Sequence, residues 1–176
     1  RRAAGEHTLA EVDLVEVLQR VSETLAPLVA RQAVAWDLEV PGEPLVVTGS
    51  SDQIERAVLN LASNAVKYTP EGGHVACVLR RDADEVVILV QDTGIGIAPD
   101  ELDRLFGRFF RASSARARSI AGAGLGLSIA HEIIASHGGR IEVTSELDLG
   151  TTFVIHLPGA PPGSAASPAA PALASA

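Results

Sequence analysis

The sequence is short of cysteine, of aromatic residues and of long apolar runs. Its single cysteine, Cys77, leaves no partner for an internal disulfide, which suits a reducing compartment. Only 3% of the 176 residues are aromatic while 47% are hydrophobic, so the core has to be aliphatic, and the chain is long enough to build one. No apolar run approaches the roughly 20 residues that cross a bilayer.

Positive charge is scarce too. The formal net charge is −8 at pH 7, and no run of like charges stands out. A nucleic-acid surface needs a basic stripe, so that class of partner is excluded. The one basic cluster lies within residues 104–118 and precedes a glycine-rich segment. Such a cationic loop is typical of a lid over an anion; a charged surface loop is the alternative, favoured for Arg116 and Arg118.

Helices and strands are interleaved along the chain. Apolar residues at alternating steps of four and three predict a first helix, with Asp13 and Glu16 as a capping box. Further helices are expected over 51–67, near 99–106, and from Leu125 to the glycines at 138–139. Strand-like runs cover 35–40, 44–49, 74–81, 85–92, 140–146 and 151–157. The pattern predicts an α+β sandwich, with a mixed sheet and helices on one face.

The two ends differ from the middle in composition. Residues 1–12 are polar and are expected to be a loose lead-in, followed by a single folded domain over 13–158. Residues 159–176 contain only Pro, Gly, Ala, Ser and one Leu. Such a tail cannot build a core and should be disordered.

Three polar residues recur on one face of the second helix. Asn60, Asn64 and Lys67 stand at i, i+4 and i+7, so they share a stripe. Amide oxygens are hard ligands that suit Mg²⁺, and a lysine supplies a point charge for phosphate. An ordinary solvated polar face is the alternative reading of this stripe taken alone.

An acid stands at the end of an apolar strand. "EVVILVQDTGIGI" ends its apolar run on Asp92 and then turns at Gly94 and Gly96. A carboxylate beside a dry pocket would accept hydrogen bonds from an exocyclic amine such as that of adenine, and the glycines would let a flat ring lie against the backbone. A simple Asp-Gly turn is the alternative.

Glycines also open the third helix, where "AGAGLGLSIAHEII" places Gly122, Gly124 and Gly126. Helix N-termini expose free N–H groups and bind phosphate. The segment lacks the preceding strand of a dinucleotide fingerprint and the Gly-Lys-Ser/Thr ending of a P-loop. Each element alone is weak, but together and in this order they indicate an adenine nucleotide with a metal on its phosphates.

This order of motifs resembles the ATP-binding catalytic domain of sensor histidine kinases, over residues 12–158. "NLASNAVKYTP" resembles the N box, "DTGIGI" the G1 box, "LFGRFFR" the F box, "GAGLGL" the G2 box and "GTTFVIHLP" the closing strand. The wider superfamily includes gyrase, mismatch-repair ATPases and heat-shock chaperones. The resemblance implies a two-layer α/β sandwich of the Bergerat type, with three helices over a mixed five-stranded sheet.

The resemblance also implies roles at the base. Asp92 would hold the adenine amine, Gly94 and Gly96 would shape that pocket, Tyr68 would line the nucleotide's edge and Thr151 would support the adenine pocket.

At the phosphates, the resemblance implies that Asn64 ligates Mg²⁺ and that Asn60 supports metal and phosphates. Lys67 would touch phosphate, and Arg111 would reach the terminal phosphates from the lid. Asn60, Lys67 and Arg111 are therefore the expected catalytic groups. The backbone of the glycine-rich segment would cradle phosphate through Gly122, Gly124, Leu125, Gly126 and Leu127.

Position 60 separates the branches of the superfamily. Hydrolysing members carry a glutamate there as general base, and the amide of Asn60 cannot take a proton. We therefore expect ATP to be held for transfer to a histidine and not to be hydrolysed quickly. The alternatives are an ATPase whose hydrolysis drives a clamp, and a non-catalytic nucleotide-binding scaffold.

None of the five histidines lies in the His-Glu/Asp-x-x-x-Pro segment of a family phosphoacceptor; the His-Glu pair at His131 lacks the proline. The chain is thus expected to be a catalytic fragment. Its expected partners are ATP, an upstream dimerisation and phosphoacceptor domain of the same kinase, and a response regulator. We expect no nucleic acid, no direct membrane contact by this fragment, and a cytoplasmic location within a membrane-anchored kinase.

Overall fold

The computed structural model describes residues 10–110, 112–113 and 124–160. Its helices are α1 (Leu14–Gln32), α2 (Ser51–Tyr68), the 3₁₀ helix η1 (Pro99–Arg104) and α4 (Gly126–Ser136). Its strands are β1 (Ala10–Asp13), β2 (Ala35–Glu39), β3 (Val46–Gly49), β4 (His74–Asp82), β5 (Glu85–Asp92), β6 (Arg140–Glu146) and β7 (Gly150–Pro158). Arg111, Gly122 and the expected tail from residue 161 onward lie outside the described residues.

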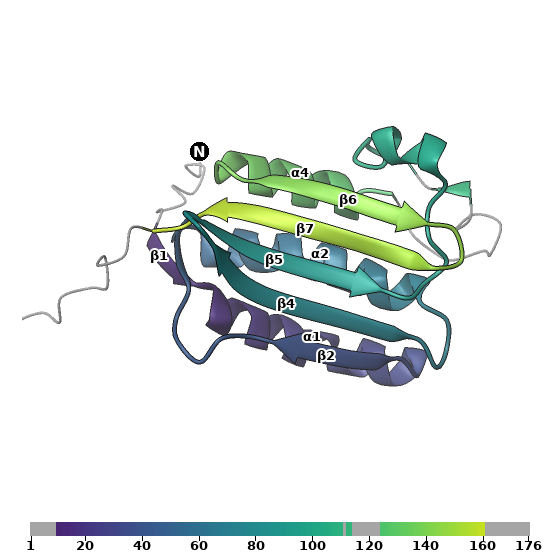
Figure 1. The fold of residues 1–176 in the computed structure, drawn as a ribbon, viewed down its shortest axis with the longest axis horizontal. Helices are drawn as coiled ribbons and strands as arrows, with labels where there is room; N and C mark the ends of the chain where they lie inside the picture. The colour runs from purple at the N-terminus through teal and green to yellow at the C-terminus, as the bar shows by residue number, and fades with distance from the viewer. Residues whose placement is uncertain (1–9, 111, 114–123, 161–176) are drawn as a thin grey trace, which may run out of the picture.

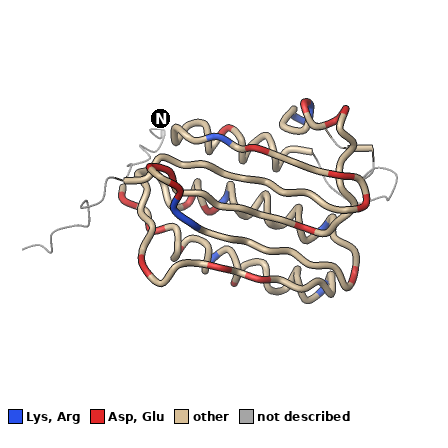
Figure 2. Tube along the Cα trace, viewed as in Figure 1, with Lys and Arg blue, Asp and Glu red and all other residues tan. Residues whose placement is uncertain are grey.

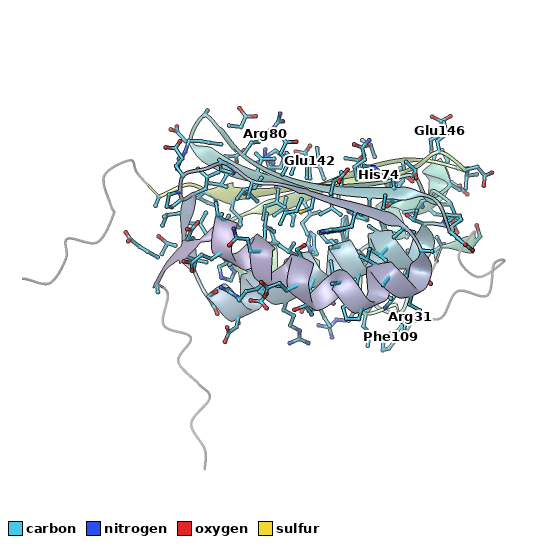
Figure 3. All side chains as sticks on the ribbon, turned by 90° about the horizontal axis from the view of Figure 1, so that it is seen from below. Arg31, His74, Arg80, Phe109, Glu142 and Glu146 are labelled. Atoms are coloured by element: carbon cyan, nitrogen blue, oxygen red, sulfur yellow. The ribbon has the colours of Figure 1, made fainter. Side chains whose placement is uncertain are left out.

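Five strands form one mixed sheet in the order β2-β4-β5-β7-β6. β2 runs parallel to β4, and every other neighbouring pair is antiparallel. Helices α1, α2 and α4 cover one face of this sheet (Figures 1 and 3). His74, Arg80 and Glu142 lie on the opposite side (Figure 3). The predicted two-layer arrangement, with a mixed five-stranded sheet and helices on one face, is confirmed.

Alternation along the strands places aliphatic side chains under the helices. In β5 the side chains of Val86, Ile88 and Val90 are fully buried, because residues two apart share a face of the sheet. Helix α2 contributes Ile54 and Leu61, both without solvent exposure, to the same core. Burying such a side chain stabilises the fold by roughly 1.5–3 kcal/mol. The core is largely aliphatic, as the composition requires.

Strand β1 was not predicted from the sequence, whereas β3 lies within the predicted run 44–49. β1 occupies the end of the stretch expected to be a loose lead-in, and it pairs antiparallel with β3 in a separate two-stranded sheet. The chain returns to the same place after β7, where the N–H of Ala160 donates to the carbonyl of Val46. Only Val12 of β1 is buried among its apolar positions, so four residues gave too little alternation to be recognised.

The helix ends agree in part with the predicted caps. Asp13 Oδ1 accepts a hydrogen bond from the Val15 N–H at 2.9 Å and so caps α1. Ser50 is the N-cap of α2 but makes no side-chain capping bond. Its backbone N–H donates instead to Nε2 of His137, 3.0 Å away at the end of α4. This bond ties the beginning of α2 to the end of its neighbour α4.

Candidate functional site

One pocket opens between the C-terminal half of α2, the end of β5, the beginning of β7 and the beginning of α4. Predicted site residues that line it are Asn60, Asn64, Lys67, Tyr68, Asp92, Gly96, Gly124, Leu125, Gly126, Leu127 and Thr151. Gly94 lies beside it without lining it, whereas Arg111 and Gly122 fall outside the described residues. Segments far apart in the sequence therefore meet around one cavity.

Asp92 is the buried acid of this pocket. β7 carries no charged residue, and β5 carries charges only at its two ends (Figure 2). The residue is 6% exposed, and its Oδ1 accepts hydrogen bonds from the N–H groups of Gly94 at 2.8 Å and Thr151 at 3.2 Å. Burial raises the pKa of Asp92 to about 6, against the lowering effect of these two bonds. No donor from the described residues reaches Oδ2.

Two glycines allow the backbone to pass close to its neighbours after Asp92. A Cβ added at Gly94 would lie 2.5 Å from the carbonyl oxygen of Tyr68. Gly96 has a φ of +66°, and an added Cβ would lie 1.9 Å from the carbonyl oxygen of Glu146. The loop is thus held between the end of α2 and the β6–β7 hairpin, so both glycines are required by space, and Gly96 also by conformation.

The α2 stripe faces the pocket as the spacing predicted. Asn60, Asn64 and Lys67 all line it. Nδ2 of Asn60 is buried and has no hydrogen-bond partner among the described residues. A buried donor without a partner destabilises a protein by about 1–3 kcal/mol. A bound anion would supply the missing acceptor, so the amide-rich stripe fits a phosphate chain carrying a hard divalent cation.

The beginning of α4 completes this end of the pocket. Gly126 is the first helical residue, and Leu125 makes no side-chain capping bond. Gly124 has a φ of +71°, and its carbonyl accepts a hydrogen bond from the N–H of Phe109 at 2.9 Å. The uncapped start of an eleven-residue helix, beside Asn60, is suited to phosphate.

Sequence reasoning missed the apolar walls. The pocket is also lined by Ile95, Ile97, Leu105, Phe110, Ala112 and Phe153. In a sequence these residues look like core, because an apolar side chain carries no mark of whether it faces a ligand or another side chain. Phe110 lies within the segment that resembles the F box, and that segment was the one available signal.

His131, which precedes a glutamate in the sequence, does not line the pocket. His131 is exposed on α4, and its ring lies 5.1 Å from that of Phe106. His137 is used within the fold, as described above. Cys77 is fully buried, and burial raises its pKa to about 12. The thiol therefore stays protonated and behaves as a small apolar residue.

The fold is a two-layer α/β sandwich, and its pocket lies between the helices and one end of the sheet. The sequence model of the "Histidine kinase-, DNA gyrase B-, and HSP90-like ATPase" family matches residues 49–161. The chain belongs to this family, and membership implies that it binds ATP.

One curated relative is named a sensor-like histidine kinase, and another is named a sensor protein. The chain is 39% identical over 163 residues to the sensor-like histidine kinase SenX3 of Mycobacterium tuberculosis, covering 89% of this chain and 39% of that protein. It is 43% identical over 113 residues to the sensor protein SrrB of Staphylococcus aureus, covering 64% of this chain and 19% of that protein. The chain thus spans well under half the length of either relative.

Two solved structures are similar to the chain in both sequence and fold. The mycobacterial sensor histidine kinase MprB is 36% identical with a TM-score of 0.76, covering 86% of this chain and 99% of that one. Full-length ShkA in complex with AMPPNP is 33% identical with a TM-score of 0.75, covering 90% of this chain and 32% of that one. Within the described residues, no helix is both long enough and apolar enough to span a membrane.

Proposed function

We propose that this chain is the ATP·Mg²⁺-binding catalytic part of a two-component sensor histidine kinase. It would transfer the γ-phosphoryl group of ATP to a histidine on a separate dimerisation domain of the same kinase, from which a response regulator would receive it. The observation that carries the proposal is one pocket that is lined by both a buried acid and an amide stripe. The 39% identity to SenX3 over most of the chain supports it.

Asp92 would read the base. Its pKa of about 6 leaves most of the carboxylate ionised at neutral pH. The ionised Oδ2 would accept a hydrogen bond from the amine of adenine, while Oδ1 stays on the backbone of Gly94 and Thr151. A donor from the ligand would favour the charged form, so nucleotide binding and ionisation of Asp92 support each other.

The amide stripe would hold the phosphates. Asn64 would ligate Mg²⁺, Asn60 would donate from its unpartnered Nδ2, and Lys67 would place a positive charge nearby. The metal, when bound, neutralises charge that develops on the transferred group. From the resemblance alone, Arg111 would reach the terminal phosphates.

The chemistry would rest on position, without a base from this chain. Asn60 occupies the place of the catalytic glutamate in hydrolysing relatives, and an amide cannot accept a proton. Phosphoryl transfer demands mainly alignment and charge neutralisation. An imidazole is a nucleophile without prior deprotonation by the enzyme, so a histidine acceptor suits this site better than water does.

The expected location follows from the relatives alone. Both curated relatives are named as sensor proteins. We propose that this chain is the cytoplasmic part of a membrane-anchored kinase.

The decisive test supplies the missing acceptor. The chain is mixed with radiolabelled ATP, Mg²⁺ and a dimerisation domain that carries the phosphoacceptor histidine, and the product is tested for an acid-labile, base-stable phosphoryl linkage. Label should appear on the acceptor domain and be lost when its histidine is replaced by glutamine. Rapid release of inorganic phosphate without acceptor would favour a clamp ATPase, and failure to bind ATP would favour a scaffold.

A further inference from the structure

Ser145 lies between two walls of the end of the pocket that contains Asp92. We call this end the base end, because we propose that it holds the nucleotide base. Ser145 is the penultimate residue of β6 and is paired across the hairpin with Thr151. Its Oγ lies 2.8 Å from Oγ1 of Thr151 and 3.0 Å from the carbonyl oxygen of Gly150. The same Oγ accepts a hydrogen bond from the N–H of Ile97 at 2.8 Å. One hydroxyl therefore joins the hairpin to the loop after Asp92.

The Ser145 hydroxyl has a single proton for two acceptors. When it donates to Gly150, the Thr151 hydroxyl is left to donate to Ser145 and turns its lone pairs elsewhere. When it donates to Thr151, the proton of the Thr151 hydroxyl is free for another partner. In both arrangements Ser145 decides which way the hydroxyl of Thr151 points.

Thr151 and Ile97 both line the pocket, and Ser145 does not. Thr151 is 7% exposed, and its backbone N–H donates to Asp92 at 3.2 Å. Thr151 is thus fixed twice: its amide by the buried acid, and its hydroxyl by Ser145. On the other side, Ser145 fixes the backbone of Ile97, one residue beyond the close approach of Gly96 to the hairpin.

We propose that Ser145 is a positioning residue for recognition of the nucleotide base. It orients the Thr151 hydroxyl beside Asp92 and holds the loop at Ile97 at its distance from the hairpin, without touching the ligand itself. The proposal rests on the nucleotide site proposed above. It adds a determinant of base affinity that the pocket lining does not reveal.

The test compares ATP and ADP binding by isothermal titration for the whole chain and its Ser145→Ala variant. The two nucleotides share a base and differ in phosphates, so both affinities should fall by the same factor, roughly tenfold, which is the size of one lost hydrogen bond. Ser145→Thr retains the hydroxyl and should bind within about threefold of the parent. Thr144→Ala, an exposed change one residue away, is the matched control and should have no effect.

A double-mutant cycle separates positioning from general loosening of the fold. If Ser145 acts through Thr151, then Ser145→Ala should weaken binding much less in a Thr151→Val background than in the parent, because coupled residues are not additive. Full additivity would refute the proposal, and so would unchanged ATP binding by Ser145→Ala. Ser145→Cys keeps the volume and should lose affinity as Ser145→Ala does, which covers the case in which the alanine variant fails to fold.

The outcome is separable from that of the phosphotransfer assay. A parent chain that binds ATP but labels no acceptor would overturn the proposed reaction and leave the role of Ser145 intact. If the Ser145 variants bind ATP with parental affinity and the acceptor is labelled normally, the role of Ser145 is refuted and the proposed reaction stands.

Discussion

The two ends of the pocket, which we propose to hold the base and the phosphates, are built in different ways. At the base end, Asp92 already has two hydrogen bonds, and Thr151, Ser145 and the loop at Ile97 are tied to one another. At the phosphate end, Nδ2 of Asn60 is buried without a partner among the described residues, and α4 begins without a side-chain cap. One end is preorganised, whereas the other presents donors that a ligand would satisfy.

Because of this difference, we expect one end of the pocket to determine nucleotide affinity and the other to determine the rate of phosphotransfer. A preorganised base end reads the nucleotide at little cost in ordering, because its groups are fixed before the ligand arrives. The phosphate end would contact the phosphoryl group that is transferred, where charge develops during the reaction. Changes at the base end should therefore alter affinity, and changes at the phosphate end should alter the rate of transfer.

The largest effect is expected from Asn64→Asp. The added charge changes the metal geometry, so phosphotransfer should fall about 100-fold, while ATP affinity changes less than about fivefold. Transfer is measured by label on the acceptor domain, and affinity by titration. Gln53→Glu makes the same chemical change on α2 away from the pocket and should behave as the parent. Normal transfer by Asn64→Asp would refute the assigned role.

Gly96→Ala should break the base end outright. The added Cβ would meet a backbone oxygen at 1.9 Å and would also sit at a φ of +66°. We expect a loss of roughly 2–4 kcal/mol in the free energy of unfolding, measured by denaturant titration. Gly72→Ala is the matched control, because Gly72 has a φ of +79° but open space around it. It should cost only about 1 kcal/mol, and equal losses would mean that the contact with the hairpin is unimportant.

Asp92→Asn should have opposite effects on binding and on stability. The amide keeps an Oδ1 for Gly94 and Thr151 but loses its charge, so ATP should bind about tenfold or more weakly and discrimination against GTP should shrink. Because burial raises the pKa of Asp92 from 3.8 to about 6, ionisation destabilises the parent fold. Without nucleotide, the variant should therefore be more stable than the parent at pH 7, by up to about 3 kcal/mol.

The extra stability of Asp92→Asn over the parent should increase as the pH rises. The folded parent holds its proton up to about pH 6, whereas the unfolded chain releases it near 3.8. The stability that protonated Asp92 gives to the folded parent is thus fully present below about pH 3.8 and is lost as the pH rises through 6. Denaturant titrations at several pH values should show the gap between variant and parent opening over this interval. A constant gap would contradict a raised pKa.

The smallest effect is expected from pH acting on binding. With a pKa of about 6, the ionised fraction of Asp92 falls about tenfold between pH 7 and pH 5. ATP affinity should fall by up to that factor in the parent beyond the fall seen in Asp92→Asn, which corrects for titration of the phosphates. Parallel pH profiles for the two proteins would show that the carboxylate does not face the base.

The sequence predicted those site residues that interrupt a pattern. Asp92 ends an otherwise apolar strand, and the glycines after it mark a turn, so both stood out. Asn60 and Asn64 were visible because helical spacing aligns them. Ser145 was not, because a single hydroxyl in a strand looks the same whether it faces solvent or a second hydroxyl brought in by the hairpin register.

The architecture was predictable for a similar reason, and its exceptions are instructive. Long strands such as β4 and β5 contain apolar runs bounded by polar residues, and α1 and α2 repeat their apolar stripe over several turns. β1 has four residues, and its pairing with β3 depends on a segment more than thirty residues away. Arg111 and Gly122 were predicted at the site and lie outside the described residues, so their roles stay predictions.

The small β1–β3 sheet places the entry and the exit of the domain next to each other. Strand β3 is paired with β1 on entry to the domain and meets Gly159 and Ala160 on exit from it. It ends at Gly49, and α2, which carries the amide stripe, begins at Ser51. A single residue, Ser50, therefore separates the strand that contacts both the entry and the exit of the domain from the helix that would hold the phosphates.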